Sequence, residues 1–220
     1  MIAIIAIAHV LISHGVAIGT SVLTVSLEYR AFKTNNQKLD GLAKNMAKWI
    51  LIITTTIGAM TGVGIWFSTT VIQPDSIGSL LRIFFWAWVT EWVCFITEVI
   101  LLLVYYYTWN RWQDPEKKRK HIYIGIALSI ASWLTMAIIT GVLAAKLTPG
   151  KWIETFSFWN AFFNPTYLPS LGFRMFLAIL LAIVFAAFFI RLFVKELSVR
   201  EEAFKVFGFW GAISLPMTFV

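Results

Sequence analysis

Long apolar segments alternate with short polar and basic segments along almost the whole chain. Five apolar runs are complete, and a sixth begins near Phe204 and is unfinished at Val220. A helix that crosses a bilayer needs about 20 mainly apolar residues, and each complete run is long enough. We therefore predict an all-α, polytopic transmembrane helix bundle that forms a single domain over residues 1–220. The predicted spans are about 2–27, 49–72, 80–107, 122–145, 171–194 and, as the incomplete sixth, 204–220.

Basic residues gather in alternate loops. The segments after the first, third and fifth spans hold most of the lysines and arginines, whereas the loops on the other side hold only Lys146 and Lys151. Cytoplasmic loops of membrane proteins are enriched in Lys and Arg. We expect the basic side to be cytoplasmic and the N-terminus to be outside, most simply in the inner membrane of a bacterium. The net charge of +7 follows from these loops and does not indicate nucleic-acid binding.

Composition supports the membrane class and excludes several others. The chain is 59% hydrophobic, and its mean hydropathy is +0.78. The single cysteine, Cys94, cannot form an internal disulfide and is expected to be a small packing residue. The sequence contains no P-loop, no dinucleotide fingerprint and no nucleophile elbow. Hydrolytic and nucleotide-driven chemistry is therefore not expected.

The third span carries two glutamates, Glu91 and Glu98. They are seven residues apart, so they fall on one helix face, roughly 10 Å apart along the axis. Ionisable groups inside a membrane are costly and usually face a cavity, a partner or an ion path. We interpret this pair as candidate proton-transfer or cofactor-environment residues. The alternative is a position near water or a hydrogen bond between helices without chemistry.

The first span contains two of the three histidines, His9 and His14. A neutral imidazole is a common metal ligand, and ligation of a haem iron would also solve the problem of burying it. Five residues place the two side chains about 140° apart around a helix, so they are not expected to bind one metal together. A hydrogen bond to a neighbouring helix is the alternative role for each. The spacing itself is not a specific motif.

Small residues follow these histidines. Gly15 and Gly19 are separated by one helical turn, and three glycines lie within the segment 58–64 of the second span. Such faces allow close approach of another helix or of a flat ring such as a porphyrin, and the sequence does not choose between them. Three methionines are conceivable axial ligands, although packing is the commoner use: Met60, Met136 and Met175.

Other polar residues lie near the span ends. His121 begins the fourth span behind four basic residues and is expected at the interface, not as a ligand. Arg174 enters the fifth span and is a candidate partner for a carboxylate, including a haem propionate, with snorkelling to the interface as the alternative. The aromatic loop at about 146–170 is expected on the membrane surface, against a partner or against its own helix ends.

Several of these features occur in an order typical of one family. They are an early histidine followed by Gly19 and Glu28, the run Gly58–Gly62, the pair Glu91 and Glu98, the exit Trp109–Arg111 and the dipeptide Asn164–Pro165. Together with the outside N-terminus, this set resembles the N-terminal half of subunit I of the cytochrome bd quinol oxidases. The resemblance covers roughly residues 8–171 and is strongest in the first three spans.

The resemblance implies roles for particular residues. The histidine of span one is an axial haem ligand in that family; His9 is the better match by its distance to Gly19, with one residue inserted, and His14 is the competitor. Glu98 matches a glutamate associated with the haem region and its proton supply. Glu91 falls near the other family glutamate, displaced by one position.

The implied function is that of a haem-binding membrane redox subunit of a respiratory complex. It would pass electrons between quinol or quinone and haem b, with coupled proton uptake, as part of an oxidoreductase. The expected partners are other membrane subunits, lipid and a soluble or membrane-anchored cytochrome c on the outer face. A cofactor-free scaffold subunit is the alternative, and an ion or proton transporter is a weaker one because no inverted repeat is visible.

The chain also departs from the family pattern. A family histidine that ligates the low-spin haem shortly after the Asn-Pro pair is missing, because residues 168–174 contain none. The sequence stops before the family's quinol-binding loop and before its later Met and Glu ligands. We expect a continuation of the chain or a partner to complete the bundle.

Overall fold

The computed structural model describes residues 2–219, and every regular element within them is helical. In chain order the elements are α1 (Ile2–Val10), the π-helix η1 (Leu11–Gly19), α2 (Thr20–Thr34), α3 (Gln37–Ile53), the π-helix η2 (Thr54–Gly58), α4 (Ala59–Ile72), α5 (Pro74–Ile83), α6 (Phe85–Thr108), α7 (Pro115–Leu147), α8 (Trp152–Thr155), α9 (Phe158–Phe162), α10 (Tyr167–Phe193) and α11 (Leu197–Met217).

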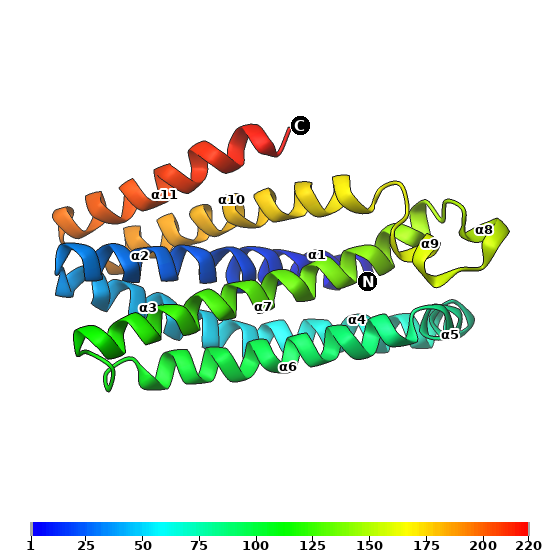
Figure 1. The fold of residues 1–220 in the computed structure, drawn as a ribbon, viewed down its shortest axis with the longest axis horizontal. Coiled ribbons are helices and arrows are strands. Elements are labelled where there is room, and N and C mark those ends of the chain that lie inside the picture. Colours follow the sequence, from blue (N-terminus) through cyan, green and yellow to red (C-terminus); the bar gives the residue numbers. More distant parts are fainter. Residues whose placement is uncertain (1, 220) are drawn as a thin grey trace.

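Five long apolar helices form the bundle (Figure 1). Two of them are composite, since α1, η1 and α2 form one rod and α3, η2 and α4 form another. The five cover Ile2–Thr34, Gln37–Ile72, Phe85–Thr108, Pro115–Leu147 and Tyr167–Phe193, and each is long enough to cross a bilayer. The prediction of an all-α, polytopic bundle is confirmed.

Three helix connections lie at one end of the bundle, between α2 and α3, α6 and α7, and α10 and α11 (Figure 1). These are the three basic segments of the sequence, so the positive charge is concentrated at this end, which we call the cytoplasmic end. The first connection is tight because Asn35 adopts a left-handed conformation (φ 49°) and the Asn36 side chain caps α3 by accepting from the amide of Leu39.

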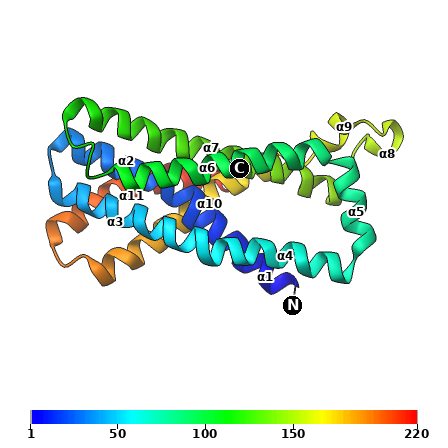
Figure 2. The ribbon, with the colours of Figure 1, turned by 90° about the horizontal axis from the view of Figure 1, so that it is seen from below.

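The opposite end, which we call the outer end, carries α5, α8 and α9. Figure 2 shows α5 crossing this end between α4 and α6. The third long helix begins at Phe85 and not near residue 80, because the chain bends at Phe84. Residues 80–83 belong to α5, whose N-terminus is set by Pro74 at its first position. The second long helix begins at Gln37, well before its apolar stretch. Its start is set by the Asn36 cap and not by the rise in hydropathy.

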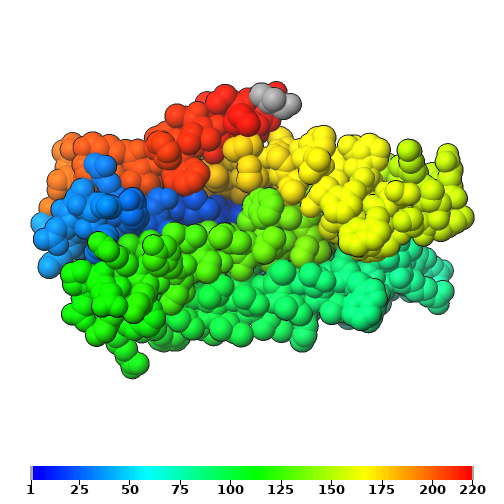
Figure 3. Space-filling view, viewed as in Figure 1, coloured from blue at the N-terminus to red at the C-terminus, as the bar shows by residue number. Residues whose placement is uncertain are grey.

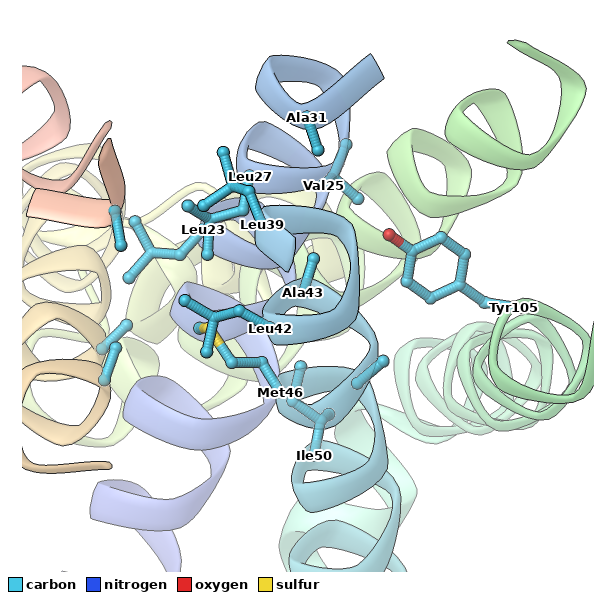
Figure 4. Packing of buried hydrophobic residues seen from close by; sticks show 14 of the residues in the cluster. Leu23, Val25, Leu27, Ala31, Leu39, Leu42, Ala43, Met46, Ile50 and Tyr105 are labelled. Carbon is cyan, nitrogen blue, oxygen red and sulfur yellow. The ribbon is translucent and has the colours of Figure 1, made fainter. Parts of the chain in front are cut away.

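Buried apolar side chains form two clusters. The larger one fills the cytoplasmic half, where leucines of α2 and α3 interlock and Tyr105 of α6 extends its hydroxyl toward these helices (Figure 4). The smaller one lies toward the outer end and includes Phe84, Met136 and Phe162. Many large apolar side chains remain exposed, as expected of a helix bundle surrounded by lipid.

Candidate functional site

His9 faces α4, and its ring nitrogens have different surroundings. Its Nδ1 lies 3.1 Å from Oγ1 of Thr61. The Thr61 hydroxyl already donates its proton to backbone carbonyls of its own helix, with the Ile57 oxygen at 2.8 Å. Thr61 Oγ1 must therefore accept from His9 Nδ1–H, which leaves a lone pair on Nε2. That nitrogen makes no hydrogen bond to any described residue.

The π-helix η1 begins two residues after His9 and ends at Gly19. This is the interval in which the family resemblance requires one inserted residue. A π-helical turn accommodates an extra residue without breaking the helix, and such turns are often found at functional sites. An inserted residue can therefore be accommodated within this segment.

His14 lies in a different environment. It is buried on η1, and its Nδ1 lies 3.1 Å from the Ser13 hydroxyl, which donates to the carbonyl of Val10. Its Nε2 lies 3.4 Å from Nη1 of Arg174 on α10. Because a guanidinium can only donate, the lone pair of His14 Nε2 is turned toward Arg174. Arg174 itself forms no ion pair with any described residue.

The glycines of the first two spans are contact points between helices. A methyl group on Gly19 would collide with the carbonyl of Ala178 on α10, and one on Gly15 would lie 2.6 Å from the Phe185 ring. A methyl group on Gly62 would lie 3.1 Å from the ring of His9. Close approach of α10 therefore accounts for Gly15 and Gly19, and the His9 ring packs against Gly62.

Glu98 and Glu91 lie on the same face of α6, but only one has a polar partner. The Ser132 hydroxyl of α7 donates to Glu98 Oε1 at 2.7 Å. Glu91, two turns nearer the outer end, forms no hydrogen bond or ion pair with a described residue. Tyr105 continues this face by another seven residues toward the cytoplasmic end. The three side chains thus mark one line along α6, with steps of about 10 Å.

At the cytoplasmic end the structure reveals a buried polar cluster that the sequence did not predict. The expectation that His121 lies at the interface was wrong, since its side chain is fully buried. Its Nδ1 lies 2.6 Å from Glu28 Oε1, and its Nε2 lies 2.8 Å from the Tyr105 carbonyl oxygen. The Tyr105 hydroxyl donates to the other oxygen of Glu28 at 2.6 Å.

Lys118 joins two carboxylates in the same cluster. Its Nζ lies 2.8 Å from Glu28 Oε1 and 2.6 Å from Asp40 Oδ1. The indole of Trp109 donates to the second oxygen of Asp40 at 2.8 Å, and the Lys118 ammonium lies 4.4 Å from the Trp109 ring centroid. We call Glu28, Asp40, Tyr105, Trp109, Lys118 and His121 the cytoplasmic cluster. The helical spacing of Lys118 and His121, which puts both on one face, was the available sequence signal.

The aromatic loop is divided between packing and exposure. Phe162 is buried against Gly141, and the Asn164 side chain donates to the carbonyl of Ala161 at 3.0 Å. The side chains of Phe156 and Trp159 remain exposed. Part of the loop therefore packs on its own helix ends, and part of it offers an aromatic surface.

The conceivable methionine ligands have different surroundings, and no described cluster of three or more His, Cys, Asp or Glu side chains is arranged to hold a metal ion. Met60 is 74% exposed on α4, whereas Met136 is buried in the outer apolar cluster.

A cavity of about 950 Å³ opens between α2, α7, α10 and α11, where the surface is hollowed beside α11 (Figure 3). Met175 and Trp133 line it, but neither His9 nor His14 does.

Exposed ion pairs attach α11 to the rest of the cytoplasmic end. Arg30 of α2 lies 3.0 Å from Glu202, and Lys38 of α3 lies 2.7 Å from Glu196. Hydrogen bonds from Lys205 and Arg30 lower the pKa of the Glu202 carboxyl, and a hydrogen bond from Lys38 lowers the pKa of Glu196.

Comparison with known proteins places this arrangement in a family. The sequence model for cytochrome bd terminal oxidase subunit I matches residues 1–220. A solved bd oxidase from Geobacillus thermodenitrificans has a similar fold, with a TM-score of 0.74 at 18% identity. That match covers 99% of this chain and 54% of the other, so this chain spans about half its length. No curated protein matches. Because the family model covers every residue, the chain belongs to the cytochrome bd terminal oxidase subunit I family of integral inner-membrane proteins of bacteria.

Proposed function

We propose that this chain is the haem-binding part of a membrane respiratory oxidase that takes electrons from quinol, with His9 as an axial ligand of a b-type haem. Family membership supports the oxidase assignment. The observation that carries the haem proposal is the geometry of His9, whose Nδ1 is held by Thr61 while Nε2 keeps a free lone pair. Metal-ligating histidines almost always donate their other ring N–H to a second group in this way.

His14 is the weaker candidate for the ligand. Its Nε2 lone pair faces the guanidinium of Arg174, so iron would have to displace that contact. We assign Arg174 a different role. Its positive charge lies inside the bundle without a carboxylate among the described residues, and it is therefore suited to an anionic group such as a haem propionate.

The haem would supply one-electron redox chemistry, and the chain would supply the iron ligand and proton access. Glu98 is the candidate proton carrier, because it lies within the bundle and its carboxyl group is oriented by the Ser132 hydroxyl. Glu91 continues the same face toward the outer end. The proposed partners are further membrane subunits of the complex, surrounding lipid and, on the outer face, a soluble or membrane-anchored cytochrome c.

A reduced-minus-oxidised visible spectrum of the detergent-purified complex tests the haem proposal. We expect a haem b signal that is lost in His9→Ala and retained in His14→Ala. Loss in His14→Ala alone would transfer the ligand role to His14. Assembly of both variants with an unchanged spectrum would refute ligation by this chain.

A second experiment separates proton transfer from haem binding. Glu98→Gln keeps the shape of the side chain but cannot carry a proton, so we expect unchanged haem content and slower quinol oxidation. Glu154→Gln, on the exposed helix α8, is the matched control and should behave as the wild type. Equal loss of haem and turnover in Glu98→Gln would contradict the proton role.

One observation favours the cofactor-free scaffold as the second candidate. The first turns of α10 follow the Asn164–Pro165 pair, and residues 165–174 contain no histidine that could ligate a further haem. The same spectrum decides between the two. A complex that assembles without any haem dependent on this chain would establish the scaffold role.

A further inference from the structure

Both ring nitrogens of His121 face hydrogen-bond acceptors. Nε2 lies 2.8 Å from the Tyr105 carbonyl oxygen, which can only accept, so Nε2 carries a hydrogen atom. Nδ1 lies 2.6 Å from Oε1 of Glu28. If His121 were neutral and Glu28 ionised, a nitrogen lone pair would face a carboxylate oxygen at this short distance without a proton between them. The pair must therefore contain one additional proton.

The other neighbours of Glu28 indicate where this proton resides. The Tyr105 hydroxyl donates to Oε2, and the Lys118 ammonium lies 2.8 Å from Oε1. The hydrogen bond from Tyr105 and the ion pair with Lys118 stabilise the ionised carboxylate, which places the additional proton on His121 as an imidazolium ion. Asp40 accepts a hydrogen bond from the Trp109 indole and forms an ion pair with the Lys118 ammonium.

The charges of the cytoplasmic cluster then sum to zero. Glu28 and Asp40 contribute two negative charges, Lys118 and His121 contribute two positive ones, and Tyr105 and Trp109 are neutral donors. The cluster is drawn from four helices, with Glu28 on α2, Asp40 on α3, and the remaining four residues on or next to α6 and α7. Because the side chains of Glu28 and His121 are fully buried, an unbalanced charge here would be costly.

We infer that Glu28 and His121 form a buried proton-binding site, in which one shared proton makes the cytoplasmic cluster electrically neutral and holds together the ends of α2, α3, α6 and α7. This site is separate from Glu91 and Glu98 and does not depend on a bound haem. Tyr105 and Lys118 are its positioning residues, since each contacts Glu28 directly.

Charge balance gives the inference a distinctive test, the thermal unfolding of the intact complex in detergent. Glu28→Gln removes the anion that holds the shared proton, so His121 either remains an imidazolium ion without its partner or loses the proton, whereas His121→Gln leaves one cation against two anions. We expect each single variant to unfold at a lower temperature than the wild type. The double variant retains the Asp40–Lys118 pair and is neutral, so it should unfold at a higher temperature than either single variant. Additive losses, or a Glu28→Gln variant as stable as the wild type, would overturn the inference.

A measurement on the unmodified protein covers the case in which the variants fail to fold. Nitrogen-15 NMR of the complex labelled in histidine distinguishes an imidazolium ion, with two protonated nitrogens, from a neutral ring. The chain has three histidines, and only His121 has acceptors on both sides. We expect an imidazolium signal at neutral pH that remains in His9→Gln and in His14→Gln and disappears in His121→Gln. Its absence from the wild type would refute the shared proton.

Discussion

The ring nitrogens of His9 and of His121 differ in how completely they are hydrogen-bonded. His9 is half-buried, has one hydrogen bond to a threonine and keeps one nitrogen free. His121 is fully buried, and both of its nitrogens are bonded within a cluster drawn from four helices. A side chain that is to bind a ligand must keep an unsatisfied atom, whereas one that stabilises a buried helix junction must not. The same residue type therefore occurs in two environments in one chain, one suited to the proposed ligation of iron and one to joining helix ends, and hydrogen bonding distinguishes them.

The largest expected effect comes from removing the buried cation of the cytoplasmic cluster. Lys118→Met leaves the carboxylates of Glu28 and Asp40 buried without their shared cation, and breaking a buried ion pair typically costs about 3–5 kcal/mol. Thermal or denaturant unfolding of the purified complex measures this loss. Lys120→Met is the matched control, because Lys120 is exposed and pairs only with Glu116. Similar stabilities for the two variants would show that the buried cluster does not hold the helices together.

The next effect concerns the helix contact beside the histidines. Gly19→Ala places a methyl group against the Ala178 carbonyl of α10, and overpacking of this kind costs about 1–3 kcal/mol. Gly41→Ala in α3 meets nothing within 4 Å and should stabilise by about 0.5–1 kcal/mol through helix propensity. Changes of opposite sign in the free energy of unfolding would show that the contact with α10, and not the alanine itself, causes the loss in Gly19→Ala. A neutral Gly19→Ala would mean that α10 does not approach η1 closely.

A smaller effect tests the hydrogen bond that distinguishes His9. Thr61→Val keeps the shape of the side chain but removes the acceptor of His9 Nδ1–H. Loss of such a supporting group typically lowers metal-site affinity about 10–100-fold, so we expect lower haem occupancy at limiting haem, measured by absorbance. Thr70→Val is the control, since Thr70 lies on the same helix, is exposed and also bonds to a backbone carbonyl. Equal haem occupancy in the two variants would contradict the proposal that His9 ligates the haem iron.

The smallest effect is a pH dependence at the exposed attachment of α11. The lowered pKa values of Glu196 and Glu202 mean that both ion pairs contribute at neutral pH. A carboxyl with a lowered pKa stabilises the fold above its ordinary pKa, and this contribution is lost as the pH falls through the lowered value. In acid we expect faster hydrogen exchange in α11 than in α3 after correction for intrinsic rates. The change should be small because exposed pairs are screened. Glu202→Gln should reduce it, and an unchanged response would rule out this pair as its origin.

Hydropathy and loop charge were sufficient to predict the five long helices and the end at which the basic loops gather. The start of α6 was not predictable in the same way, because the bend at Phe84 has no proline or glycine at that residue to mark it. The glycine faces were recognised, but a helix and a flat ring require the same small residues. Only the position of α10 against Gly19 shows which one is present.

The candidate residues also differ in whether the sequence alone could reveal them. His9, Glu91 and Glu98 could be named because a polar residue inside an apolar run is conspicuous. Glu28 and His121 could not be paired, since 93 residues separate them and each lies near a span end where charge is ordinary. Their burial depends on four helix ends meeting at one point, which a single sequence does not encode in a readable pattern.

The π-helix η1 has a consequence for how the first span is aligned with other proteins. One extra residue in an α-helix would rotate everything before it by about 100°, and η1 absorbs this rotation over Leu11–Gly19. Deletion of a single residue from this segment is therefore expected to convert it to α-helix and to leave His9 facing Thr61, whereas the same deletion within an α-helical part of the span would turn His9 away. Alignments that forbid gaps inside membrane helices will pair another residue with the family histidine and will leave His9 out of the comparison.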